Sequence, residues 1–250
     1  MNIKNTLLLT VDFFKKPRTI GFLVSVLAVF ITINLVNQQY VISKENKIKE
    51  MNAYLKVIQN NIESSFKECY SATLTLALTI NDKGEPQNFD KIAASIINNN
   101  PHIEVLELVP KGVIKYIYPL KGNEKAFGLD ILLSKQHRKE ALKSIATNKM
   151  YFEGPIELIQ GGKGIVGRIP IYKNNTFWGF SALVIKLENL YDFFDIKYIN
   201  QSKYYFQLSK VDPNTSKEIF FLKAPKNHND YNYVTSFIPD SDWKLYLIDK

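Results

Sequence analysis

The hydrophobic pattern changes several times along the chain, and each change predicts a different kind of element. From Thr19 to Val36 the chain reads TIGFLVSVLAVFITINLV, without a charged side chain. A helix of this length at 1.5 Å per residue spans about 27 Å, close to the thickness of a bilayer core. The stretch is long for the apolar core of a cleaved signal, and no small-x-small cleavage site follows it. We therefore predict an uncleaved transmembrane helix at residues 19–36.

Beyond this stretch, apolar or small residues recur every three or four positions. The series is Ile48, Met51, Leu55, Ile58, Ile62, Phe66, Cys69, Thr73, Leu76 and Ile80. Such spacing predicts one long helix with an apolar stripe, ended by Gly84 and Pro86 in the turn at 81–86. We assign a stalk helix to residues 37–82. Its stripe packs either on the chain's own domain or on a second copy of the chain, and Cys69 is accordingly either a buried free thiol or a cross-dimer disulfide.

After a short helix at 89–97, period-two alternation and turn residues predict strands. We expect two strands at 103–109 and 113–118, a helix at 135–147 with Leu142 and Ile145 facing inward, and three antiparallel strands at 156–160, 165–172 and 176–187. This order is typical of an α+β, PAS-like sensor domain in which helices enclose an antiparallel sheet, here residues 83–187.

Residues 188–250 repeat a helix and strands in smaller form. The helix is expected at 190–196, and the strands at 204–209, 218–222, 233–237 and 243–248. About sixty residues are marginal as an independent domain. We predict a membrane-proximal α+β half-domain that leans on the stalk helix.

The distribution of charge adds an orientation and excludes one class of partner. The net charge is +8, of which Lys4, Lys15, Lys16 and Arg18 against Asp12 supply +3 before residue 19. The positive-inside rule keeps residues 1–18 in the cytoplasm and places residues 37–250 outside. The other lysines are scattered, so no nucleic acid is expected as a partner. Richness in Lys, Asn and Ile is compatible with a low-GC bacterium, and we expect localisation to a bacterial inner membrane.

A series of short motifs spans residues 105–184. They are PKGVI at 110–114, YPLKGN at 118–123, GLDIL at 128–132, GPIEL at 154–158, GRIPIY at 167–172 and FWGF at 177–180. In order and spacing the segment resembles the CHASE family of extracellular sensor domains. The resemblance implies a PAS-like, ligand-binding module at the outer end of a membrane receptor. The positions that recognise cytokinins in plant members hold Lys115 or Tyr116, and Glu153, so the ligand class stays open.

The same resemblance implies a second transmembrane helix and a cytoplasmic output, such as a histidine kinase or a cyclase. Because the chain stops at Lys250, we expect truncation before that output, which would carry any enzymatic activity. Within the chain, His102, His137 and His228 are far apart in sequence, and no zinc-protease or nucleophile motif occurs. The glycines of 161–164 lie between two predicted strands, which indicates a hairpin turn and not a phosphate loop. We expect no enzyme, metal or cofactor.

In a PAS-like fold the ligand lies between the inner face of the sheet and the elements that cover it. Our candidate ligand-binding residues are Tyr116, Tyr118, Asp130, Gln160, Arg168 and Tyr172. Asp130 lies among apolar residues and needs a partner, for which Arg168 or Arg138 is available. The guanidinium of Arg168 is suited to clamp a carboxylate or phosphate. Each candidate also has a structural interpretation. Tyr116 and Tyr118 are alternatively core or edge tyrosines, Asp130 and Arg168 alternatively form structural salt bridges, and Gln160 alternatively caps the turn that follows it.

Two functional hypotheses follow. In the first, a small molecule binds outside the membrane, and the chain relays a conformational change through the stalk helix of a homodimer to an output domain. In the second, the chain is a periplasmic protein-interaction module without a small-molecule ligand. An open pocket behind Tyr116, Tyr118 and Arg168 would favour the first hypothesis, and a filled one would favour the second.

Overall fold

The computed structural model describes residues 17–196, 203–222, 232–239 and 241–250, so most of the expected cytoplasmic segment lies outside the described residues. The chain forms two units, Met1–Met51 and Asn52–Lys250. Helix α2 (Pro17–Ala77) runs through both of them. Among the described residues, it is the one helix long and apolar enough to cross a membrane.

The polar residues within the predicted transmembrane stretch satisfy their hydrogen bonds inside the helix. The Ser25 and Thr32 hydroxyls and the Asn34 amide each donate to the carbonyl four residues earlier, at 2.8–2.9 Å. Internal bonds of this kind make polar side chains tolerable in hydrocarbon, where no water can serve as a partner. The polar interruptions are therefore compatible with a membrane span.

The second unit contains a five-stranded antiparallel sheet. Its strands are β1 (Val105–Pro110), β2 (Tyr116–Tyr118), β3 (Tyr151–Glu157), β4 (Lys163–Lys173) and β5 (Thr176–Lys186), in the order β2-β1-β5-β4-β3. The predicted PAS-like sheet is confirmed. The prediction of a strand at 156–160 was wrong in its bounds. The strand begins at Tyr151 and ends at Glu157, because the buried run from Tyr151 to Glu153 pairs with β4 and the chain turns at 158–162.

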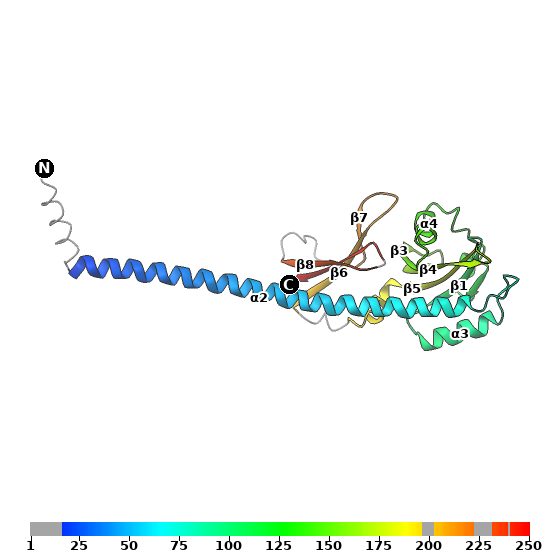
Figure 1. The fold of residues 1–250 in the computed structure, drawn as a ribbon, viewed down its shortest axis with the longest axis horizontal. Coiled ribbons are helices and arrows are strands. Elements are labelled where there is room, and N and C mark those ends of the chain that lie inside the picture. The colour runs from blue at the N-terminus through cyan, green and yellow to red at the C-terminus, as the bar shows by residue number, and fades with distance from the viewer. Residues whose placement is uncertain (1–16, 197–202, 223–231, 240) are drawn as a thin grey trace. The chain divides into compact units, whose positions relative to one another are not determined.

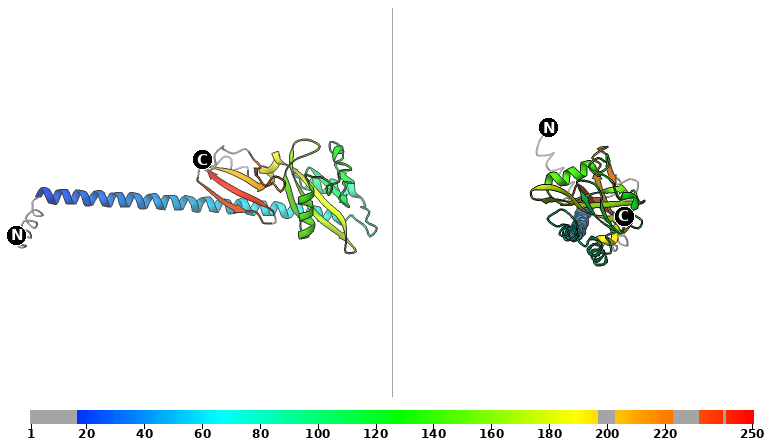
Figure 2. Two further views of the ribbon diagram at one scale, coloured as in Figure 1. Left: turned by 90° about the horizontal axis from the view of Figure 1, so that it is seen from above. Right: turned by 90° about the vertical axis from the view of Figure 1, so that its right-hand side faces the viewer.

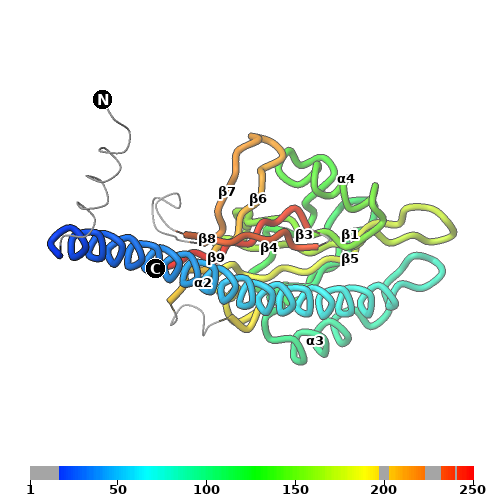
Figure 3. Tube along the Cα trace, turned by 60° about the vertical axis from the view of Figure 1, so that its left-hand side comes forward, coloured from blue at the N-terminus to red at the C-terminus, as the bar shows by residue number. Residues whose placement is uncertain are grey.

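Helices cover both faces of this sheet (Figure 1). Residues 52–77 of α2 and helix α3 (Phe89–Asn99) lie on one face, and helix α4 (Arg138–Thr147) lies on the other. Figure 3 shows α3 alongside the last turns of α2. The prediction that Leu142 faces inward was wrong, since it is 44% exposed. α4 instead turns its small or polar side chains inward: Glu140, Ala141 and Ser144 are buried.

A second antiparallel sheet follows the first along residues 52–77 of α2 (Figure 2). Its strands are β6 (Tyr204–Val211), β7 (Glu218–Phe220), β8 (Tyr233–Phe237) and β9 (Trp243–Asp249), in the order β7-β6-β9-β8. The short 3-10 turn Leu187–Asn189 and helix α5 (Leu190–Phe193) connect the two sheets. The expected helix at 190–196 is thus shorter than predicted.

The apolar stripe of α2 packs on the chain's own domain. From Leu55 to Ile80 every residue of the predicted stripe is buried. Phe66 stacks on Phe152 of β3 with ring centroids 3.8 Å apart and meets Trp243 of β9 edge-on at 5.4 Å, so it contacts both sheets. Cys69 is a buried free thiol, which removes the cross-dimer disulfide. A second copy would therefore have to use another face of the helix.

Candidate functional site

Two charged residues lie in one row across the five-stranded sheet. Glu107 of β1 is opposite Ala182 of β5, and Ala182 is opposite Arg168 of β4. Residues opposite one another in antiparallel strands point to the same face. The adjacent row on that face consists of Val105, Val184, Val166 and, on β3, Glu153. Glu107 and Arg168 therefore flank a small residue, beside a row that holds three valines and Glu153.

The other face of β4 explains the glycine before Arg168. A Cβ at Gly167 would lie 2.5 Å from the Met150 side chain and 2.8 Å from that of Phe152. Only glycine fits this close approach without displacing its neighbours. Gly167 thus lets β3 and β4 pack against α2 while Arg168 points to the opposite face.

The segment between β2 and α4 covers the charged face. Its buried residues Ala126 and Ile131 join Ile117 of β2 and the strand valines in one hydrophobic cluster, and the 3-10 turn Glu124–Ala126 lies within the segment. Asp130 shapes this cover, since its Oδ1 accepts the Leu132 and Leu133 amides at 2.9 and 3.0 Å. The expected ion pair of Asp130 with Arg168 or Arg138 was wrong, because the carboxylate caps its own turn.

A cavity of about 40 Å³ lies between the sheet and this cover. Its polar lining consists of Glu107, His137, Glu157, Gln160 and Arg168, and the rest is aliphatic. A volume of this size holds one or two water molecules, whereas pockets for drug-sized ligands measure about 300–1,000 Å³. The covering segment must therefore move to admit a ligand larger than a few atoms.

Arg168 takes part in a buried ion pair. It is 3% exposed and donates from Nη1 to Oε2 of Glu153, which is itself buried. Nδ1 of His137 lies 2.7 Å from the other Glu153 oxygen. Burial acts to raise the pKa of the Glu153 carboxyl, but the charges and hydrogen bonds of Arg168 and His137 outweigh it and lower the pKa. Glu153 is thus an anion, and His137 donates to it through Nδ1–H.

Glu107 has no such compensation. It is 6% exposed, and no group in the described parts of the chain donates a hydrogen bond to its carboxylate. Burial raises the pKa of Glu107 to about 7, although Arg168 and His137 act in the opposite direction. The Nε–H of Arg168 is buried without an acceptor. The row therefore holds one acceptor without a donor and one donor without an acceptor.

The structure brings together only part of the predicted site. Gln160 and Arg168 line the cavity. Tyr116 and Tyr118 share a strand face, as expected, but this is the face of Leu106 and Leu108, opposite to that of Glu107. There the Tyr116 ring lies 5.7 Å from the ring of Phe89 in α3.

Tyr172 is 40% exposed near the hairpin of β4 and β5, where it contacts Phe177. Glu107, His137 and Glu153 were missed as members of the site. The signal for Glu107 was present in the run Val-Leu-Glu-Leu-Val-Pro, where one charge interrupts an apolar strand.

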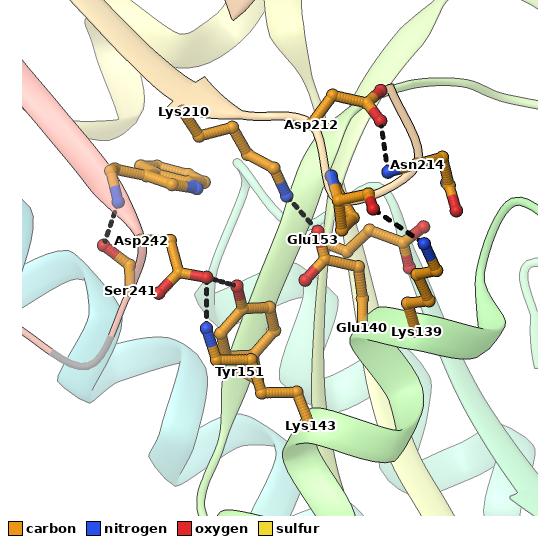
Figure 4. A network of polar contacts seen from close by, with 12 residues as sticks. Lys139, Glu140, Lys143, Tyr151, Glu153, Lys210, Asp212, Asn214, Ser241 and Asp242 are labelled. Carbon is orange, nitrogen blue, oxygen red and sulfur yellow. Dashed lines mark hydrogen bonds and ion pairs between the residues drawn. The ribbon is translucent and has the colours of Figure 1, made fainter. Parts of the chain in front are cut away.

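Polar contacts join α4 and β3 to the second sheet (Figure 4). The buried Glu140 of α4 pairs with the buried Lys210 of β6. Asp242, just before β9, accepts hydrogen bonds from Lys143 of α4 and from the Tyr151 hydroxyl of β3. Since His137 immediately precedes α4 and lines the cavity, the same helix contacts the cavity region at one end and the second sheet along one side.

Comparison with models of known protein families gives a match that covers part of this chain. Residues 110–221 match the model of the CHASE domain, as the motifs predicted. The match covers part of both sheets. No curated protein sequence matches the chain.

Solved structures show the same fold at low identity. An extracellular ligand-binding receptor from Desulfohalobium retbaense DSM5692 aligns with a TM-score of 0.62 and 12% identity over 80% of this chain and 40% of its own length. The ligand-binding domain of the Pseudomonas fluorescens chemoreceptor CtaA, in complex with L-serine, aligns with a TM-score of 0.55 and 14% identity, covering 82% and 96%. The ligand-binding domain of the Pseudomonas aeruginosa PAO1 amino acid chemoreceptor PctC, in complex with GABA, aligns with a TM-score of 0.54 and 14% identity. The alignment covers 77% of this chain and 94% of that domain. This chain therefore spans less than half of the first structure and nearly all of the other two.

Proposed function

Because residues 110–221 match the CHASE domain on a fold shared with chemoreceptor ligand-binding domains, we propose that this chain is the extracytoplasmic sensing region of a membrane receptor. A small molecule binds between the first sheet and its cover, and α2 anchors the region in the membrane with its N-terminus in the cytoplasm. Two observations beside one cavity carry the proposal. Glu107 is a buried residue whose carboxylate accepts no hydrogen bond from the described residues, and the buried Nε–H of Arg168 has no acceptor among them.

Buried unsatisfied groups favour a small-molecule ligand over a protein partner. Leaving such a group unpaired costs about 1–3 kcal/mol, and more for a charge, so their retention calls for a partner that enters the cavity. The surface of another protein would not reach beneath the cover formed by residues 119–137. Two of the structural neighbours were solved with L-serine and with GABA, which supports a ligand of similar size here.

The signal is proposed to pass through the contacts of α2. The Ser181 hydroxyl of β5 donates to the Thr73 carbonyl at 2.8 Å, and the Ser65 hydroxyl donates to the Phe193 carbonyl at 2.8 Å. Residues 52–77 are thereby tied to the first sheet and to the connection to the second. Ligand binding shifts the helix only if the ligand has different affinities for two arrangements of these contacts. A homodimer and an output domain beyond this chain complete the proposed receptor.

The test is a thermal-shift screen of the full chain in detergent against a library of small metabolites. We expect at least one compound to raise the melting temperature in a dose-dependent way. Ala182→Val adds two methyl groups between Glu107 and Arg168 and should abolish that shift, because it fills a cavity of only about 40 Å³. Ala146→Val makes the same change at an exposed position of α4 and should preserve it. A shift that survives Ala182→Val would place the ligand elsewhere.

A further inference from the structure

The buried charges around the cavity do not balance. Glu153 and Arg168 neutralise one another as an ion pair, with His137 donating to the same carboxylate. Glu107 remains as a second carboxylate in the same apolar face, with no donor among the described residues. Glu157 also lines the cavity, but its side chain is 72% exposed and pairs with Lys163 at 3.3 Å. The uncompensated group in the wall is thus Glu107.

We infer that the ligand carries a protonated amine next to an oxygen acceptor, on a short aliphatic body. This inference rests on the proposed function of the cavity. The amine donates to the Glu107 carboxylate, and the oxygen accepts the free Nε–H of Arg168. Ala182, which lies between these two residues in the sheet row, leaves space for the atoms that connect the amine to the oxygen.

Other classes of ligand fit the cavity less well. At pH 8, above the pKa of about 7 of Glu107, an anion without an amine would bring a further negative charge beside Glu107 and Glu153, and would leave the Glu107 carboxylate without a donor. A purely apolar molecule would leave both buried groups unpaired. The walls formed by Ile131, Val166 and Val184 suit an aliphatic body but offer nothing to a second charged group. A compact amine with an adjacent oxygen satisfies all of these constraints.

Two sources share this chemistry, namely amino acids, whose oxygen belongs to a carboxylate, and amino alcohols, whose oxygen belongs to a hydroxyl. They are separated by measuring calorimetric binding of matched compounds to the full chain in an amine-free buffer at pH 8. The first set is L-alanine, L-alaninol and propionate, and the second set is L-valine, L-valinol and isovalerate. We expect binding by amine-bearing members of at least one set, and none by the two carboxylates.

The decisive variant is Glu107→Gln, which keeps the shape of the side chain but removes its charge. It should weaken amine binding at least tenfold, because charge-assisted hydrogen bonds are about twice as strong as neutral ones and the ammonium would lose its counter-charge. Glu104→Gln changes a part-exposed glutamate just before the same strand, paired with Lys186, and should leave binding unchanged. Circular dichroism checks that both variants are folded.

The outcomes separate this inference from the function on which it rests. Binding of propionate or isovalerate as tightly as their amines, binding unaffected by Glu107→Gln, or no binding by any amine would overturn the ligand class. In that case the metabolite screen decides whether the sensing function survives. It survives if the screen yields a compound that has no amine and whose thermal shift is abolished by Ala182→Val. If the screen yields no compound at all, both fail.

Discussion

At the scale of single residues, Glu153 holds the buried charges of the site together. Its carboxylate accepts from Arg168 and from His137, and all three side chains are buried. Removing one partner of a buried ion pair leaves the other charge uncompensated, at a cost of about 3–5 kcal/mol. We expect Glu153→Gln to lower the free energy of unfolding by about this amount in urea titrations at pH 7.

The control for this loss is Glu157→Gln, four residues further on. Its carboxylate is largely exposed and pairs with Lys163, so the change should cost no more than about 1 kcal/mol. Because the pKa of Glu153 is lowered by folding, its contribution is present above the ordinary carboxyl pKa and is lost as pH falls through the folded value. Equal stabilities of the two variants would contradict the buried ion pair.

Glu107 has the opposite dependence on pH. Folding raises its pKa to about 7, so the folded chain binds a proton more tightly than the unfolded chain. The stabilising contribution of that proton is complete below the ordinary carboxyl pKa of about 4.3 and is lost as pH rises through about 7. Glu107→Gln changes the free energy of unfolding by a different amount at each pH. We expect this change to be more stabilising at pH 8 than at pH 4 by about 2–4 kcal/mol.

Urea titrations of wild type and variant at the two pH values provide the measurement. The groups facing Glu107 are Arg168 of β4 and His137 before α4, with Glu153 of β3 bonded to both. Glu104→Gln, at the part-exposed start of the same strand, controls for removal of a carboxylate as such. An effect of Glu107→Gln that is the same at pH 4 and pH 8 would show that its carboxyl titrates normally.

Arg168 was predicted from the sequence, whereas Glu107 was missed, and its place beside Arg168 could not be predicted for a physical reason. An arginine between glycine and a β-branched residue in a strongly apolar strand is conspicuous, because guanidinium groups are rarely buried without a purpose. Glu107 likewise interrupts an apolar run, but the run alone does not show which group its carboxylate faces. Only the register, which places Glu107 opposite Ala182 and Ala182 opposite Arg168, brings the two groups to one face. Register depends on pairings far apart in sequence, which local pattern does not specify.

At the scale of elements, α4 connects the cavity side of the first sheet to the second sheet. Glu140 and Lys210 form a buried pair across this junction. A second, exposed pair joins Lys143 to Asp242, and Figure 4 shows Glu140 and Lys143 extending from α4 toward their partners. The two pairs differ mainly in burial, which allows a direct comparison of their contributions.

We expect Glu140→Gln to destabilise the chain by about 3–5 kcal/mol, because Lys210 would remain charged and buried. Lys143→Gln should cost no more than about 1 kcal/mol, since both members of its pair are exposed. The double variant Glu140→Leu with Lys210→Met should recover most of the loss by replacing the pair with apolar side chains. Urea titration at pH 7 measures all three. A loss in Lys143→Gln as large as that in Glu140→Gln would mean that burial does not set the strength of these contacts.

The long helix shows how far an element can be predicted. Spacing of three and four fixed its existence and its stripe, and the stripe from Leu55 onward is buried as expected. Whether the stripe met its own domain or a second copy depended on the sheets, whose apolar faces were visible in the sequence only as separate strands. The inward face of α4 was missed because it buries Glu140 and Ser144 while leaving Leu142 exposed, which inverts the usual pattern of an amphipathic helix.

At the scale of the whole molecule, the proposed topology places residues 37–250 on one side of a membrane and residues 1–18 on the other. The single cysteine provides a silent background for testing it. Cys69 is buried, and burial raises the pKa of its thiol, so the reactive thiolate is scarce. The native chain should therefore react poorly with a membrane-impermeant maleimide before and after the membrane is opened.

Two added cysteines then report the two sides. Lys121→Cys lies at an exposed position beyond β2 and should be labelled in intact spheroplasts. Asn5→Cys, in the predicted cytoplasmic segment, should be labelled only after detergent opens the membrane. The reverse pattern would invert the topology and move the proposed ligand cavity into the cytoplasm. Labelling of both positions in intact spheroplasts would instead mean that residues 19–36 do not separate the two segments, and the long apolar helix would need another explanation.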